Sequence, residues 1–157
     1  MARAHHVKKA RKAIKGTDIK KGDSYYWWKF RRGGKHFSKT PPRRSQLTRS
    51  EFYAAIYDIE DEIAGLTADE TLSSVVEDIA SRLRELGEEC QSKFDNMPEG
   101  LQQGDTGQLL EERVSACESM ADEFESLDFD DKEDDETDEE YWERKLEEVQ
   151  AVDIQNP

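Results

Sequence analysis

The chain has 157 residues and a formal net charge of −14, with 38% charged and 34% hydrophobic residues. This composition is more polar than that of an average globular domain, so we expect a small core in one domain, or in one small domain with extensions. The sequence has no apolar run long enough to cross a membrane, and the N-terminus lacks the hydrophobic stretch of a signal peptide. We therefore expect a cytoplasmic protein.

The charge is divided unevenly along the chain. Residues 1–50 carry 16 Lys and Arg against two acidic residues, which gives +14, whereas residues 51–157 carry seven against 35, which gives −28. Such asymmetry indicates a basic arm followed by an acidic tail. The net acidity of the whole chain is therefore compatible with a nucleic-acid partner.

Residues 1–23 predict a flexible basic arm that becomes helical over 4–15 when it docks on phosphates. Two histidines, His5 and His6, lie in this arm. The third histidine is His36 and both cysteines are distant, so no metal-ligand spacing exists and we predict no metal site.

Residues 24–40 predict a β-hairpin rich in aromatic and cationic side chains. With Gly33 and Gly34 as a two-residue turn, Phe30 pairs with Phe37 and Arg31 with His36. Strand alternation then gives an apolar face made of Tyr26, Trp28, Phe30 and Phe37. The opposite face contains Tyr25, Trp27, Lys29, Arg31, His36 and Ser38. We expect a helix to cover the first face and a nucleic acid to bind the second.

The candidate nucleic-acid-binding residues are aromatic or cationic and lie in the hairpin or just after it: Tyr25, Trp27, Lys29, Arg31, Arg32, Lys35, His36, Arg43 and Arg44. Aromatic side chains that stack on single-stranded bases contribute about 1–3 kcal/mol per base. Alternatively, the two-stranded ribbon enters a major groove. The competing interpretation is that the aromatic side chains only build a small core.

Helical patterns follow. A Thr48–Glu51 capping box begins a stripe formed by Phe52, Ala55, Ile56, Ile59 and Ile63, which completes a basic head over residues 24–65. A second stripe predicts a helix over 68–96, and a third helix runs from Thr106 to Leu127. The short connection between them predicts an antiparallel helical hairpin over residues 66–127.

Cys90 and Cys117 fall on the apolar faces of these two helices, so we expect small buried thiols. An isolated helix pair rarely buries enough area, which favours a homodimer through residues 68–127 over a core made by one chain alone. Taken together, the fold class is mainly α with a small N-terminal β-hairpin: a hairpin-plus-helix head, then a long antiparallel helical hairpin.

The C-terminal segment, residues 128–157, begins with an acidic tract that we expect to be a disordered linker over 128–140. A capping box from Thr137 to Glu140 then predicts a short amphipathic helix over 138–151. This helix can dock on the body of the protein, on a partner or on the basic hairpin, or it can stay in solvent as an acidic tail.

Catalytic motifs are missing from the sequence. It contains no glycine-rich phosphate loop, no nucleophile elbow and no Cys-x-x-Cys pair, and its carboxylates fall on predicted solvent faces. We therefore predict no enzyme, no catalytic residue and no cofactor.

The segment from Tyr25 to about Ile63 resembles the arm-type DNA-binding domains at the N-termini of phage tyrosine integrases. The shared pattern is an aromatic strand Tyr-Trp-Trp-Lys-Phe-Arg, a glycine turn, a strand Lys-His-Phe-Ser-Lys and a helix. The resemblance implies a sheet in the DNA major groove with the helix behind it and these residues on the DNA side: Trp27, Lys29, Arg31, Lys35 and His36.

This resemblance covers about a quarter of the chain. The family's domains have three strands, and here residues 17–21 would have to supply the third; the family's catalytic domain has no counterpart. The stretch Lys39–Thr48 is also similar to small uncharacterised phage-encoded proteins, which implies a phage or mobile-element origin. With a phage origin, the expected cytoplasm is that of the host cell.

The first functional hypothesis is a non-enzymatic nucleic-acid-binding protein, with DNA favoured over RNA, whose basic head sits on a helical dimerisation region. The alternatives are an acidic helical interaction protein that inhibits a host protein, and a phage assembly factor.

Overall fold

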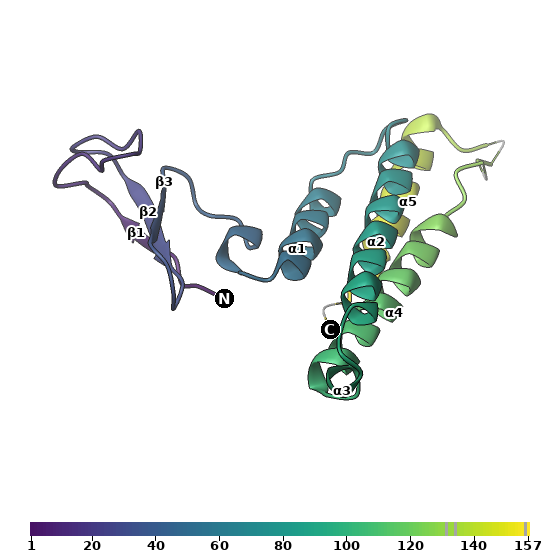
Figure 1. The fold of residues 1–157 in the computed structure, drawn as a ribbon. Helices are drawn as coiled ribbons and strands as arrows, with labels where there is room; N and C mark the ends of the chain where they lie inside the picture. Colours follow the sequence, from purple (N-terminus) through teal and green to yellow (C-terminus); the bar gives the residue numbers. More distant parts are fainter. Residues whose placement is uncertain (131, 134, 156) are drawn as a thin grey trace. The chain divides into compact units, whose positions relative to one another are not determined.

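The protein is described here from a computed structural model that places residues 1–130, 132–133, 135–155 and 157 (Figure 1). The chain forms two compact units, Met1–Asp58 and Ile59–Pro157. It is mainly helical with a small antiparallel sheet near the N-terminus, which confirms the predicted fold class.

The sheet of the first unit has three strands in the order β1-β2-β3, with β1 at His5–Val7, β2 at Tyr25–Lys29 and β3 at Lys35–Ser38. Part of the segment 4–15, which we expect to become helical on phosphates, is strand β1 in this structure, paired antiparallel with β2. Ring stacking accompanies this pairing, since His5 lies on Trp27 and His6 on Tyr26, with centroid distances of 4.4 and 4.6 Å. Cross-strand aromatic pairs of this kind stabilise a sheet.

The rest of the basic arm folds on itself between β1 and β2. The amide of Ala10 donates to the carbonyl of Asp23 at 2.7 Å, and the amide of Gly22 donates back to the carbonyl of Ala10 at 2.9 Å. Further out, the amide of Ile14 donates to the carbonyl of Ile19 at 3.0 Å, and Ile19 is buried. The arm is therefore a hydrogen-bonded loop in this structure.

The hairpin register differs from the predicted one. Trp27 pairs with Phe37, Trp28 with His36 and Lys29 with Lys35. The connection is consequently residues 30–34 instead of a two-residue turn, and Gly33 has a φ of 119°, which favours glycine. Because the register moves by three residues, an odd number, each β3 side chain lies on the opposite face from the one predicted.

Helix α1 spans Glu51–Ala64 and buries the predicted stripe at Phe52, Ile56, Ile59 and Ile63. It begins after Ser50, whose hydroxyl accepts a hydrogen bond from the amide of Tyr53 at 3.4 Å. Ser50 therefore caps this helix in place of Thr48, the residue that the capping-box pattern predicts.

The connection of the hairpin is held by the segment that precedes α1. The guanidinium of Arg49 donates to the carbonyl of Arg32 at 3.3 Å and lies 5.8 Å from the ring centroid of Phe30. Among the described residues, the element pairs with extensive contacts are β1 with β2, β2 with β3, α2 with α4 and α3 with α4. Helix α1 against the sheet is not one of these pairs, so the predicted helical cover is not confirmed.

In the second unit, α2 (Leu72–Asp95) and α4 (Asp105–Glu125) pack side by side and are joined through the short α3 (Glu99–Gln102) (Figure 1). Arg84 on α2 pairs with Glu125 on α4, while Gly87 faces Cys117, so the helices run antiparallel as predicted. Their stripes are buried at Leu72, Val76, Ile79, Ala80, Leu83, Leu86, Cys90, Leu110, Ala116, Cys117, Met120, Ala121 and Phe124. The expectation of buried thiols is confirmed.

Helix α2 begins four residues later than predicted, at Leu72. The side chain of Asp69 accepts hydrogen bonds from the hydroxyls of Thr67 and Thr71 and from the amide of Thr71. These contacts hold residues 67–71 in a turn before the helix.

Helix α5 (Asp138–Ala151) packs on the second unit, which is one of the options left open by the sequence. It buries Tyr141, Lys145 and Val149. The amide group of Gln150 donates to the carbonyl of Ile63 at 3.5 Å, and the backbone amide of Gln155 lies 3.2 Å from the sulfur of Met120. The solvated-tail interpretation of this helix is therefore wrong.

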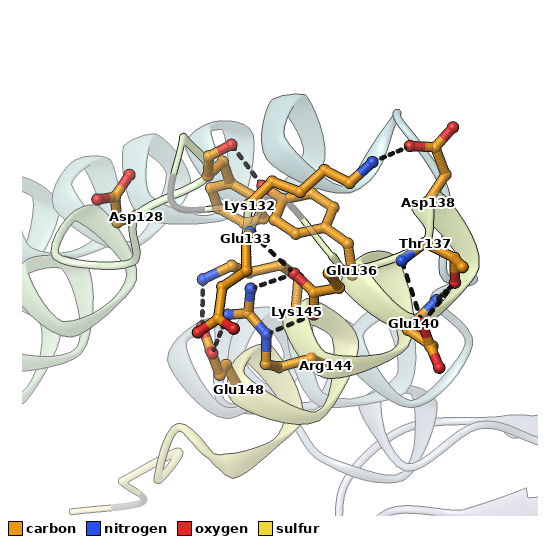
Figure 2. Close-up of polar contacts among 12 residues, drawn as sticks. Asp128, Lys132, Glu133, Glu136, Thr137, Asp138, Glu140, Arg144, Lys145 and Glu148 are labelled. Carbon is orange, nitrogen blue, oxygen red and sulfur yellow. Dashed lines mark hydrogen bonds and ion pairs between the residues drawn. The ribbon is translucent and has the colours of Figure 1, made fainter.

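Polar contacts bind α5 to the acidic segment before it, as Figure 2 shows. Arg144 of α5 forms a bidentate pair with Glu136, with both N–O distances at 2.9 Å. Within α5, the buried ammonium of Lys145 lies 2.8 Å from Glu148. The predicted capping box is present between Thr137 and Glu140. Residues 131 and 134, which belong to the predicted linker over 128–140, lie outside the described residues.

The apolar stripes of α2 and α4 are covered within one chain. Among the described residues, the large hydrophobic side chains that stay exposed are Met1 and Leu101. The homodimer through residues 68–127 stays a prediction. No helix of the described segments combines the length and apolar character needed to cross a membrane.

Candidate nucleic-acid interface

One face of the sheet, which we call the Trp27 face, gathers cationic and aromatic side chains from all three strands. The face follows from the register, because directly paired residues point to the same side and alternate residues share it. Its members are His5, Val7, Tyr25, Trp27, Lys29, Lys35 and Phe37. Four of the nine predicted site residues, Tyr25, Trp27, Lys29 and Lys35, are thus brought together.

Two side chains flank the indole of Trp27. His5 stacks on it with a centroid distance of 4.4 Å and an interplanar angle of 15°, and the ammonium of Lys35 lies 4.1 Å from the ring centroid. Since β1 and β3 lie on opposite sides of β2, these groups approach the indole from opposite sides. Trp27 therefore positions a cation through a cation–π contact and does not offer a free stacking surface.

A groove of about 500 Å³ lies beside this face, between the sheet and the basic loop. Its apolar part is formed by Val7, Ile14, Tyr25 and Phe37, all of them half-buried, and by Ala13. The rings of Tyr25 and Phe37 lie 6.1 Å apart and are tilted by 47°. The groove thus has an aromatic wall that is accessible from outside.

The remaining lining of the groove is cationic: Lys9, Arg11, Lys12 and Lys15. All four side chains are exposed, and none forms an ion pair within the described part of the chain. The two acidic residues of residues 1–50, Asp18 and Asp23, are both paired with Lys39, at 3.3 and 3.2 Å. An apolar wall with an uncompensated cationic rim matches the two parts of a nucleotide, a flat base and an anionic phosphate.

The ion pairs of Lys39 with Asp18 and Asp23 shift the pKa values of Lys39 and Asp23. The backbone amide of Lys20 and the ammonium of Lys39 donate to Asp23 and lower the pKa of its carboxyl. Hydrogen bonds to Asp23 and Asp18 raise the pKa of Lys39. These contacts join the end of β3 to the loop that carries the cationic rim, so the loop is held near the sheet.

Lys29 and Lys35 are directly opposite each other across β2 and β3, and both are exposed. Like charges in directly opposite positions destabilise a sheet. The ammonium of Lys35 is partly compensated by the indole of Trp27, and an anion bound between the two lysines would compensate the rest.

The remaining predicted residues lie elsewhere. His36 is on the opposite face, stacked on Trp28 at 5.4 Å, because the register differs from the predicted one; its assignment to the binding face is a correction. Arg31 and Arg32 lie in the connection over residues 30–34, beyond the ends of the paired strands.

The two linker arginines precede a 3₁₀ turn at Ser45–Leu47. The guanidinium of Arg44 lies 4.1 Å from the ring centroid of Tyr57, so its side chain is held against α1, whereas Arg43 is exposed. Neither residue lines the groove.

Sequence reasoning missed the groove residues Val7, Lys9, Arg11, Lys12, Ile14, Lys15 and the orientation of Phe37. The basic run was visible in the sequence, but its fold against the sheet depends on backbone contacts that no motif encodes. Among the described residues, no group of three or more His, Cys, Asp or Glu side chains is placed to hold a metal ion.

Comparisons of the chain with protein-family models, with curated proteins and with solved structures give no match.

Proposed function

We propose that the first unit binds nucleic acid through the Trp27 face and the groove beside it, without catalysing a reaction. The observation that carries this proposal is the groove itself, an aromatic wall rimmed by four cations that have no ion-pair partner among the described residues. The first unit as a whole has 16 Lys and Arg against four acidic residues, a net charge of +12.

The cationic and the aromatic residues of the site would contact different parts of a nucleic acid. The rim cations and the lysine pair of the sheet neutralise phosphates and release their counterions, which makes affinity depend on salt. Tyr25 and Phe37 provide a surface for a base. The sheet has three strands, the number found in the arm-type domains that residues 25–63 resemble, but its third strand is formed by residues 5–7 and not by residues 17–21 as expected. The resemblance itself favours DNA over RNA.

The test is a titration of the full-length protein with fluorescein-labelled 20-nucleotide DNA and RNA, single- and double-stranded, at several salt concentrations. We expect binding at low salt and a linear fall of the logarithm of the association constant with the logarithm of the salt concentration, by about 0.7–0.9 in slope for each phosphate contacted. No measurable binding at low salt to any of these nucleic acids would refute the proposal.

A pair of matched variants locates the contact. The double variant Lys12→Gln and Lys15→Gln removes two cations from the groove, whereas Lys20→Gln and Lys21→Gln removes two exposed cations of the same loop that do not line it. The first should weaken binding about tenfold or more at low salt and lower the salt slope by about 1–2, and the second should do less. Equal losses would show that the groove is not the contact.

A further inference from the structure

A second groove, of about 610 Å³, lies on the second unit along the seam between α2 and α4. Its apolar lining consists of the buried side chains of Val76, Ala80 and Phe124 and the half-buried side chains of Leu127 and Phe129. The two half-buried residues lie in the segment just after α4, so they offer apolar surface at one end of the seam.

Carboxylates edge this groove. Glu77, Glu85 and Glu88 project from α2, are exposed, and form no ion pair within the described ranges. Their spacing of eight and three residues places them on one side of the helix, because 3.6 residues make a turn. The edge is therefore a stripe of negative charge beside apolar surface.

Arg84 is the cation in the lining, and its charge is already compensated. Its guanidinium donates to both carboxylate oxygens of Glu125, at 2.7 and 2.6 Å, and to Asp122 at 2.7 Å. The hydrogen bonds from Arg84 lower the pKa of Glu125 and keep that carboxylate charged. A ligand that enters the groove thus meets a net negative rim.

The groove continues along the seam. A smaller hollow of about 170 Å³ shares Arg84 and Glu88 with it and extends to Gln91 and Glu118. From Ser73 to Gln91 the rise of α2 is about 27 Å, the length of a helix of about 18 residues.

We propose that this seam binds a cationic amphipathic helix of a partner protein. The apolar side of such a helix would lie on Leu127, Phe129 and the seam between α2 and α4, and its Lys and Arg side chains would meet the glutamate stripe. The second unit carries seven Lys and Arg against 33 acidic residues, a net charge of −26, so it attracts polycations and repels nucleic acid.

A second copy of this chain is a poorer occupant. The excess cations of each copy lie in the first unit, where the basic segment is a strand and a hydrogen-bonded loop instead of a helix. The long helices α2, α4 and α5 are themselves acidic. The helix that the seam fits therefore belongs to another protein.

The test uses the full-length protein and an 18-residue fluorescein-labelled peptide of Leu and Lys, with Leu at positions i, i+3, i+4 and i+7. A peptide of the same composition in scrambled order, which cannot form an amphipathic helix, is the control. Fluorescence anisotropy at 150 mM salt should show tighter binding of the patterned peptide by about tenfold or more, because only that peptide presents an apolar face.

Two protein variants with the same change of charge separate the seam from general attraction. The triple variant Glu77→Gln, Glu85→Gln and Glu88→Gln should weaken binding of the patterned peptide about tenfold, since three exposed charge contacts are lost. The control variant replaces three exposed carboxylates of α4 outside the groove, Glu111, Glu112 and Glu123, with Gln and should weaken it less than about threefold.

A charge-neutral variant tests the apolar part. Phe129→Ser removes an aromatic side chain of the groove but keeps the backbone carbonyl that accepts the hydroxyl of Tyr141. It should weaken the patterned peptide about fivefold or more and leave the scrambled peptide unchanged. Circular dichroism confirms that each variant retains its helices.

Three outcomes would overturn the proposal: equal affinity for the two peptides, equal losses in the two triple variants, or no loss with Phe129→Ser. A fourth concerns self-association. If the native protein dimerises in sedimentation equilibrium and the seam triple variant alone abolishes the dimer, the occupant is a second copy and the proposed partner helix is refuted.

Discussion

Replacing Gly107 with alanine should destabilise the second unit, because there is no room for a β carbon at this position. Gly107 lies in the first turn of α4, and a β carbon built on it would be 1.9 Å from the carbonyl oxygen of Gln102 and 2.7 Å from its α carbon. Both are backbone atoms, which cannot rotate away. The end of α3 would have to move by about 1.5 Å to restore ordinary van der Waals contact.

The expected magnitude follows from what this movement disturbs. The side-chain amide of Gln102 donates to the carbonyls of Phe94 and Met97 at 3.1 and 3.0 Å and so holds the turn after α2. Losing both hydrogen bonds costs about 1 kcal/mol each, and the displaced packing costs about 1–3 kcal/mol more. Alanine regains about 1 kcal/mol of helix propensity. The net loss should be about 2–4 kcal/mol.

Urea unfolding followed by circular dichroism at 222 nm measures this loss as a lower midpoint with an unchanged slope. Gly100→Ala is the matched control, because Gly100 lies in α3 with a negative φ and nothing within 4 Å of its would-be β carbon. That variant should be neutral or more stable by up to about 1 kcal/mol. If Gly107→Ala were as stable as the native protein, the close approach of α3 to α4 would be refuted.

Three further predictions concern the second unit. Thr137→Ala removes the cap of α5 and should lower the free energy of unfolding by about 1 kcal/mol in urea titrations; an unchanged midpoint would contradict the cap. Hydrogen bonds from Thr137 lower the pKa of Glu140, so the stability that they supply is complete above the ordinary carboxyl value of 4.5 and is lost as the pH falls through the lower folded value. Urea titrations from pH 7 to pH 3 should show this loss in the native protein and a smaller one in Thr137→Ala, and equal pH dependence would refute the contact. Burial raises the pKa of Cys117 to about 12 and that of Cys90 above its ordinary value, so neither thiol should react with Ellman's reagent at pH 8 until the protein is unfolded; rapid labelling of the native protein would contradict their burial.

The helices were predictable because the signals for each one, the spacing of its apolar residues and the breaks at its ends, lie within the segment that forms it. Stripes at three- and four-residue spacing, with Pro98 and Gly65 at the breaks, give all the long helices and the antiparallel hairpin. The first residues of the helices were less predictable, since several neighbouring hydroxyls and carboxylates can accept the hydrogen bonds of the backbone amides there. Ser50 caps α1 where the sequence pattern indicated Thr48, and the turn held by Asp69 delays the start of α2, for which the pattern indicated a cap at Thr67.

The docking of α5 was open from sequence because its surface is so acidic. Its three buried side chains include a lysine, Lys145, which the pattern of apolar residues could not place inside. The ammonium is tolerated there because Glu148 accepts from it at 2.8 Å. Whether such a paired lysine is buried depends on how the helix packs in the folded protein, which the local sequence does not show.

The sheet was the least predictable part of the candidate site. Two adjacent glycines indicated a two-residue turn, but the structure uses a five-residue connection and stacks His36 on Trp28. Strand β1 came from a segment whose composition indicates solvated chain. The pairing of β1 with β2 joins segments about twenty residues apart, so the groove beside it could not be derived from local patterns.

Because Lys29 and Lys35 lie directly opposite each other, an anion that binds between them should also stabilise the folded hairpin. A polyanion that binds the folded sheet and not the unfolded chain raises the free energy of unfolding by RT ln(1 + [L]/Kd), about 2.7 kcal/mol at a hundredfold excess over Kd. The small sheet should therefore melt at a temperature that depends on its ligand. The nucleic acid that we propose as ligand would then stabilise the folded sheet in addition to binding it.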